Sequence, residues 1–132
     1  MNFPQKIVQT KLTKGLIDLI VLELLEKQSM HGYQILTTIR KSYGVSFGPS
    51  TIYPLLTVME KKNYIKCEWN MNGERPRKVY TLTNNGKSML DYTTGSLKAI
   101  CKTLGTDKVQ ASAEIDHLQF SIAQSPEKRA IH

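Results

Sequence analysis

Between positions 50 and 83 the spacing of apolar residues changes from that of a helix to that of a strand, which strongly constrains the fold. Four residues at i, i+3, i+4 and i+7 share one face of a predicted helix from about Ser50 to Lys62: Ile52, Leu55, Leu56 and Met59. Every second residue is apolar from Ile65 to Met71, which predicts a half-buried strand. Asn72-Gly73 then favours a turn, and residues 78–83 supply a returning strand. The sequence therefore predicts a helix followed directly by a β-hairpin.

The loop of this predicted hairpin is basic. Arg75 and Arg77 flank Pro76, and Lys78 follows them. Proline restricts the loop, so less conformational entropy is lost when the neighbouring side chains bind a ligand. A helix can enter the major groove of DNA, and cations at a hairpin tip can reach its phosphate backbone. Solvated charge is the ordinary role of basic loop residues, but their place beside this helix favours a DNA-binding surface.

Two further helices are predicted upstream. The first follows Thr13, a candidate N-cap, and continues to about Lys27; it is apolar around most of its circumference and needs cover on more than one side. The second is expected from Ser29, as its cap, to about Arg40, with Gly44 as the stop signal. Residues 1–12 are polar and mixed, and no element is predicted there.

Three predictions concern single residues. Thr51 is expected to cap the helix of residues 50–62, which would place Pro54 at the third helical position, where its missing N–H costs no hydrogen bond. Trp69 shares a strand face with Ile65, so packing in the core is preferred over ligand stacking. His31 is interpreted as a local hydrogen-bonding residue at the start of its helix.

Two more helices are predicted in the C-terminal third of the chain. One follows Thr83, a candidate N-cap, and runs to about Leu104 before Gly105; the other spans about 107–123. Packing of these two helices on each other is one interpretation of their apolar stripes, and dimerisation is the favoured one. The residues expected at a dimer interface are Leu16, Leu90, Leu97, Ile100, Leu104, Ile115 and Leu118. The expected organisation is a DNA-binding domain over 1–86, a dimerisation region over 87–124 and a tail over 125–132.

The composition of the chain favours a polyanionic partner. Lys and Arg number 18 against 11 Asp and Glu, which gives a formal charge of +7 and a pI near 9.5. The most apolar stretch, Leu16 to Leu25, contains Asp18 and Glu23 and is too short to span a membrane. The first residues lack the apolar core of a secretory signal. No membrane association is predicted, and the expected location is the cytoplasm.

The sequence shows no constellation that indicates catalysis. Cys67 and Cys101 lie 34 positions apart, and neither has a second ligand at metal-binding spacing. The three histidines are scattered, and no set of serine, histidine and acid suggests a nucleophilic site. No enzyme activity, metal or cofactor is predicted.

Three sequence segments together resemble the PadR family of transcriptional regulators. They are Met30-His31-Gly32-Tyr33-Gln34-Ile35, Ser50-Thr51-Ile52-Tyr53-Pro54-Leu55-Leu56, and Arg75 to Thr83 with Gly86. The resemblance covers roughly residues 12–90. It implies a homodimeric winged-helix protein that binds a partly palindromic operator, usually as a repressor, with C-terminal helices at the dimer interface. A small-molecule effector of unknown identity is left open.

The sequence thus predicts a mainly α fold with a small β-hairpin: a winged helix-turn-helix domain followed by C-terminal dimerisation helices. The expected partners are double-stranded DNA and a second copy of the chain. The expected DNA contacts are Tyr33, Ser50, Thr51, Tyr53, Arg75, Arg77 and Lys78. The alternative is a winged-helix module that binds another protein within a transcription assembly.

Overall fold

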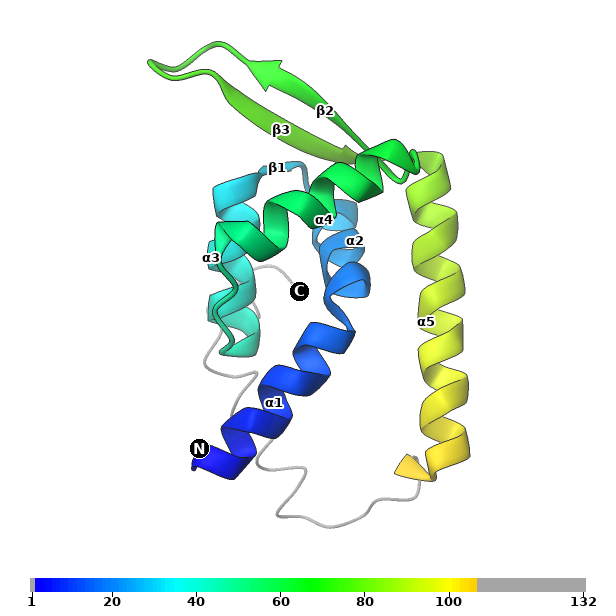
Figure 1. The fold of residues 1–132 in the computed structure, drawn as a ribbon. Helices are drawn as coiled ribbons and strands as arrows, with labels where there is room; N and C mark the ends of the chain where they lie inside the picture. Colours follow the sequence, from blue (N-terminus) through cyan, green and yellow to red (C-terminus); the bar gives the residue numbers. More distant parts are fainter. Residues whose placement is uncertain (1, 107–132) are drawn as a thin grey trace.

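The computed structural model describes residues 2–106, as helices grouped beneath a small antiparallel sheet (Figure 1). The elements in chain order are α1 (Phe3–Gly15), α2 (Ile17–Lys27), β1 (Met30–His31), α3 (Gly32–Tyr43), α4 (Pro49–Lys61), β2 (Ile65–Asn70), β3 (Arg77–Leu82) and α5 (Asn84–Leu104). This order confirms the predicted mainly α fold with a hairpin. The helix predicted over 107–123 and the tail over 125–132 lie outside the described residues.

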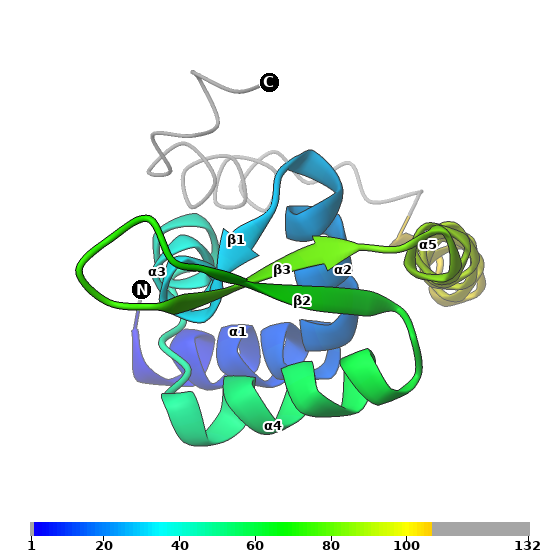
Figure 2. The same cartoon turned by 90° about the horizontal axis from the view of Figure 1, so that it is seen from above.

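One hydrophobic core joins α2, α3, α4 and the base of the hairpin. Its most completely buried side chains come from all four: Val21, Leu22, Ile35, Ile39, Ile52, Leu56 and Ile65. Figure 2 looks down on the sheet and shows α4 running beside β2, with α5 seen end-on beyond the other end of the hairpin. The apolar stripe predicted for residues 50–62 is therefore the buried face of α4, and its opposite face is left open.

The turn between α3 and α4 is held by both backbone and side chains. Gly44 adopts the left-handed conformation (φ 70°) that ends α3, as predicted. Val45 is buried and Phe47 packs against the core, so this loop is fixed rather than loose. The cap of α3 differs from the prediction: His31, not Ser29, is the N-cap, and the Ser29 hydroxyl pairs with that of Thr81 at 2.8 Å.

The start of α4 also differs from the prediction. Gly48 is the N-cap and Pro49 occupies the first turn, where proline is favoured because its φ suits a helix. Thr51 is thus inside the helix, and the placement of Pro54 at the third position is wrong. Pro54 lies within α4 and removes the hydrogen bond that the Ser50 carbonyl would otherwise accept.

The sheet has three strands in the order β1-β3-β2, all antiparallel. In the hairpin Cys67 lies opposite Tyr80, and Trp69 lies opposite Lys78. The short strand β1, which the sequence analysis did not predict, adds His31 opposite Val79. This third strand ties the start of α3 to the hairpin.

The helix α1 was not predicted. Asn2 caps it through a reciprocal pair of hydrogen bonds with Gln5, a capping box that is recognisable in the sequence. Thr13, predicted to be the cap of the next helix, is instead buried in α1 and donates its hydroxyl to the Gln9 carbonyl at 2.7 Å. A separate helix, α2, begins after its N-cap Leu16, and no side-chain hydrogen bond caps it.

The helix α5 is joined closely to the rest of the fold at its N-terminal end. Thr83 caps it by accepting a hydrogen bond from the Gly86 N–H, and Gly105 ends it in the left-handed conformation, as predicted. A Cβ atom at Gly86 would lie 2.0 Å from the Tyr64 carbonyl oxygen. Lys87 bonds to Glu26 of α2, and this hydrogen bond raises the pKa of Lys87.

Candidate nucleic-acid interface

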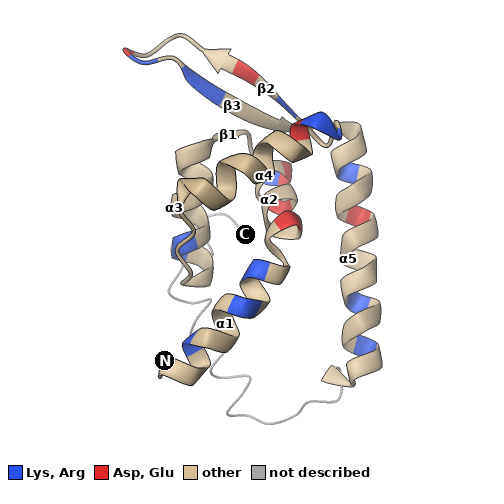
Figure 3. Ribbon diagram, in the orientation of Figure 1, with Lys and Arg blue, Asp and Glu red and all other residues tan. Residues whose placement is uncertain are grey.

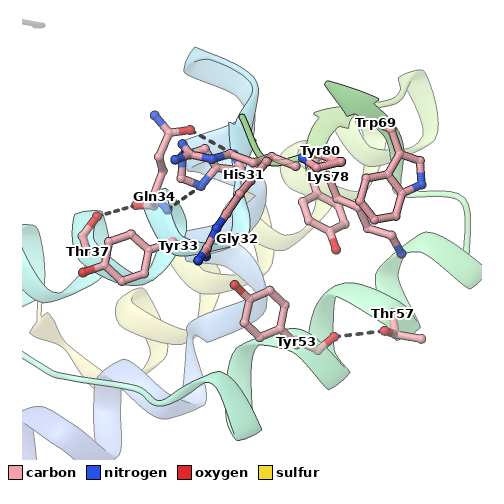
Figure 4. A pocket seen from close by; sticks show the side chains of 13 residues that line it. His31, Gly32, Tyr33, Gln34, Thr37, Tyr53, Thr57, Trp69, Lys78 and Tyr80 are labelled. Carbon is pink, nitrogen blue, oxygen red and sulfur yellow. Dashed lines mark hydrogen bonds between the residues drawn. The ribbon is translucent and has the colours of Figure 1, made fainter. Parts of the chain in front are cut away.

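An open cleft of about 1020 Å³ lies where the start of α3, the outer face of α4 and the hairpin meet. Figure 4 shows Tyr33 and Tyr53 on one side of this cleft, with Trp69 and Lys78 on the other. Five of the seven predicted DNA contacts line it: Arg75, Arg77 and Lys78 from the hairpin, Tyr33 from α3 and Tyr53 from α4. The fold therefore gathers residues that lie far apart in the sequence.

The outer face of α4 is uncharged over most of its length. Ser50 and Thr51 are exposed in the first turn of the helix but do not line the cleft, and Tyr53 is 40% exposed. Thr57 donates its hydroxyl to the Tyr53 carbonyl at 3.0 Å. The first eleven residues of α4 carry no charged side chain, and Figure 3 shows charge only at its C-terminal end. This face presents hydroxyl groups and one phenol, together with the exposed side chains of Pro54 and Val58.

The basic residues of the hairpin separate to its two faces. Residues that lie opposite each other in an antiparallel pair point to the same face, so Lys78 shares the face of Trp69. The Lys78 ammonium lies 5.7 Å from the centre of the Trp69 ring, within the range of a cation–π interaction. Arg77 is on the other face, and its Nη1 lies 3.0 Å from His31 Nε2.

Trp69 is not a core residue, so that prediction is wrong. Its side chain is 59% exposed, whereas Ile65 at the base of the same strand face is buried. Figure 1 shows the reason, because the hairpin projects beyond the helices that cover its base. Strand alternation identified the face of Trp69 correctly but carried no information on where the covering helices end.

Two titratable side chains, His31 at the cleft and Cys67 in β2, have shifted pKa values. Burial, together with the nearby Arg77 guanidinium, lowers the pKa of His31. The Cys67 thiol donates to the Glu60 carboxylate at 3.0 Å, and this hydrogen bond raises the pKa of Cys67. A thiol held in its protonated form is a poor nucleophile. Over residues 2–106, no three metal-binding side chains come together.

The residues predicted for a dimer interface lie in different environments. Leu90 is 3% exposed and belongs to the core of its own chain, while Leu16 and Leu97 are half-buried. Ile100 and Leu104 are 56% and 73% exposed near the end of α5. Ile115 and Leu118 lie outside the described residues. The unpredicted α1 adds four exposed apolar side chains: Phe3, Ile7, Val8 and Leu12.

Solved structures of proteins from three organisms are similar to this fold. A PadR family transcription regulator from hypervirulent Clostridium difficile R20291 is 31% identical, with a TM-score of 0.64 over 71% of this chain and 99% of that one. A protein from Streptococcus mutans UA159 is 32% identical, with a TM-score of 0.62 over 68% and 83% of the two chains. Bacillus subtilis PadR, solved in complex with operator DNA, is 29% identical, with a TM-score of 0.56 over 60% and 47%.

These likenesses and the element order define a winged helix-turn-helix protein, in which the hairpin of β2 and β3 is the wing. The model of the transcriptional regulator PadR-like family matches residues 21–92, more than half of the chain. The chain therefore belongs to the PadR-like family of transcriptional regulators. No curated protein matches it. In the part of the chain from residue 2 to 106, none of the helices is long and apolar enough to cross a membrane.

Proposed function

We propose that this protein is a transcriptional regulator that binds double-stranded DNA as a homodimer, with α4 in the major groove and the wing on the adjacent backbone. The observation that carries this proposal is the cleft between α3, α4 and the wing. Three cations reach it, hydroxyl and aromatic groups line it, and no carboxylate is among its lining residues. Such a surface attracts a polyanion and offers groups for contacts with bases.

The proposed contacts divide by chemistry. Arg75, Arg77 and Lys78 bind phosphate oxygens from the wing. Ser50, Thr51 and Tyr53 present hydroxyl groups at the N-terminal part of α4, where base edges and phosphates are both within reach of a helix in the major groove. Tyr33, exposed at the start of α3 on the same side of the cleft as Tyr53, contacts the backbone.

The proposed dimer interface combines α5 with α1. Ile100 and Leu104 are exposed at the end of α5, and the apolar residues of α1 remain open to solvent in a single chain. A second copy would cover both surfaces, as it would the half-buried Leu16 and Leu97. Leu90 acts indirectly, because it anchors α5 to its own domain. Ile115 and Leu118 stay predictions for the same interface, and residues 1–86 and 87–124 remain the proposed division of roles.

A dimer of this kind presents two α4 helices to one face of a duplex. Its operator would be partly palindromic, with half-sites about one helical turn or roughly 34 Å apart. Bacillus subtilis PadR was solved in complex with operator DNA, which supports the DNA-binding part of this proposal. Repression is the proposed outcome, because a bound dimer occupies promoter DNA that polymerase needs. The proposed location is the cytoplasm, because a regulator of this kind acts where the DNA is.

The proposal is tested by removing charge from the wing. The variant Arg75→Ala with Arg77→Ala should lose retardation of duplex DNA from the region upstream of its own coding sequence. The matched control is Lys41→Ala with Lys98→Ala, which removes the same charge from exposed positions outside the cleft and should bind normally. Unchanged retardation by the wing variant would reject this interface and favour a protein-binding module.

A further inference from the structure

His31 stands where β1 meets α3, and its ring receives two N–H groups. The backbone N–H of Gln34 points at Nδ1 with a separation of 3.3 Å, which makes His31 the N-cap of α3. The Arg77 guanidinium points at Nε2 at 3.0 Å from the other side. Figure 4 shows His31 and Gln34 facing each other at the upper edge of the cleft.

These two hydrogen bonds cannot both be made by a neutral imidazole. One ring nitrogen accepts, and the other carries a proton and donates. If Nδ1 accepts from Gln34, then Nε2–H faces the Arg77 N–H group, donor against donor. If Nε2 accepts from Arg77, then Nδ1–H faces the Gln34 N–H and the side-chain cap of α3 is lost, which leaves only the bond from the His31 backbone N–H to the Gln34 side chain. The Arg77 guanidinium and the backbone N–H of Gln34 in the first turn of α3 therefore compete for the single acceptor nitrogen of the His31 ring.

Protonation of His31 does not relieve this conflict in the free protein. An imidazolium donates from both nitrogens and would face Arg77 of β3 and the N-terminus of α3. Arg75 and Lys78 of the wing line the same cleft, α4 contributes the phenol of Tyr53 there, and no carboxylate is among the lining residues. Burial lowers the pKa of His31, and the positive charge of Arg77 lowers it further. What the pair lacks is an acceptor between His31 and Arg77.

We propose that His31 and Arg77 together bind one phosphate group of the DNA backbone, and that this phosphate resolves their competition. This inference rests on the proposed function. The phosphate oxygens accept from Arg77, so the guanidinium no longer needs the ring. His31 then settles in one tautomer, in which Nδ1 accepts from Gln34 and Nε2–H donates to the phosphate. The cap of α3 and the DNA contact are thereby made by the same residue.

The bound phosphate also changes the response of His31 to pH. Its negative charge stabilises the imidazolium, so the pKa of His31 should be higher in the complex than in the free protein. Proton binding then favours the complex as pH falls through the bound-state pKa, and the effect levels off below the free-state pKa. Duplex binding should therefore strengthen toward acidic pH.

The test compares the full-length wild type with His31→Asn, since asparagine is a strong N-cap but does not titrate. Binding to a mixed-sequence duplex of about 24 base pairs is measured at about 50 mM salt. At about pH 7.5 the variant should bind roughly tenfold more weakly as a dimer, while its thermal midpoint stays near that of the wild type. From about pH 7.5 to 5.5 the wild type should gain about threefold more affinity than the variant, which keeps His117 and His132.

A second readout separates phosphate binding from a merely structural role. The ¹⁵N resonances of the His31 ring should shift on addition of the duplex to those of a single tautomer with the proton on Nε2. Equal affinities for the two proteins, or weaker binding without any change in the ring resonances, would overturn the inference while the proposed function stands. Failure of the wild type to bind the duplex at any pH would instead overturn the proposed function.

Discussion

At the scale of single residues, two glycines mark places where elements meet without room for a side chain. A Cβ atom at Gly32 would lie 2.3 Å from Cε1 of Tyr53, and one at Gly86 would lie 2.0 Å from the Tyr64 carbonyl oxygen. The first neighbour is a side chain that can turn away, whereas the second is backbone that cannot. The two positions should therefore respond differently to substitution.

Gly86→Ala should destabilise the fold, because the new methyl group overlaps the backbone that joins α4 to β2. We expect a loss of about 1–3 kcal/mol or more in the free energy of unfolding, measured by urea denaturation. Gly95→Ala is the matched control in the same helix, since nothing lies within 4 Å of its Cβ position. That control should be neutral or stabilising by up to about 1 kcal/mol, and equal effects of the two changes would contradict the packing at Gly86.

Gly32→Ala should act on binding rather than on stability. The methyl group displaces the Tyr53 ring from the cleft, while alanine suits the first turn of α3 at least as well as glycine. We expect duplex affinity to fall by about threefold to tenfold, with the thermal midpoint nearly unchanged. Titration of a labelled duplex, with Gly95→Ala as the control, measures this; normal affinity would remove Tyr53 from the proposed contacts.

At the scale of elements, the sequence predicted those with strong periodicity and missed those that depend on contacts between segments. The stripe of α4 and the alternation of the hairpin were visible because their apolar residues repeat. The strand β1 has two residues and exists because Met30 and His31 pair with β3. The helix α1 was recognisable from Asn2 and Gln5, but its apolar residues stay exposed and gave no sign of a core-facing stripe.

The candidate site shows the same division. Arg75, Arg77 and Lys78 were predicted because three cations beside a turn are plain in the sequence. His31 was interpreted as a local hydrogen-bonding residue, which it is, but its bond to Arg77 depends on β1 joining the sheet. The exposure of Trp69 likewise depends on how far the wing projects past α4. The periodicity of apolar residues does not show where a residue lies relative to elements that are distant in the sequence.

The end of α5 is expected to hold two chains together. Ile100→Glu with Leu104→Glu should shift the protein to monomers at micromolar concentration, because it would place charges in the apolar interface. Sedimentation velocity measures the change. Asn85→Glu with Ser88→Glu adds the same charge to exposed polar positions of α5 and should leave the dimer intact. A dimer that survives the first variant would place the interface elsewhere.

At the scale of the whole molecule, the distribution of charge and the shape of the surface both favour the proposed DNA interface. The formal charge of +7 is spread over the chain, but the wing brings three cations to a cleft without carboxylates. The cleft-facing surface of α4 adds hydroxyl groups without charge. Phosphate contacts should therefore supply most of the affinity, and α4 should supply most of the discrimination between sequences.

The salt dependence of duplex binding tests this division most directly. If each chain makes about four phosphate contacts, the dimer makes about eight, and log affinity should fall with log salt concentration at a slope of about −7. Fluorescence anisotropy over a range of salt concentrations gives this slope from one titration series. A steep slope near that value is the expected result, and an affinity that does not change with salt would contradict the interface proposed for α4 and the wing.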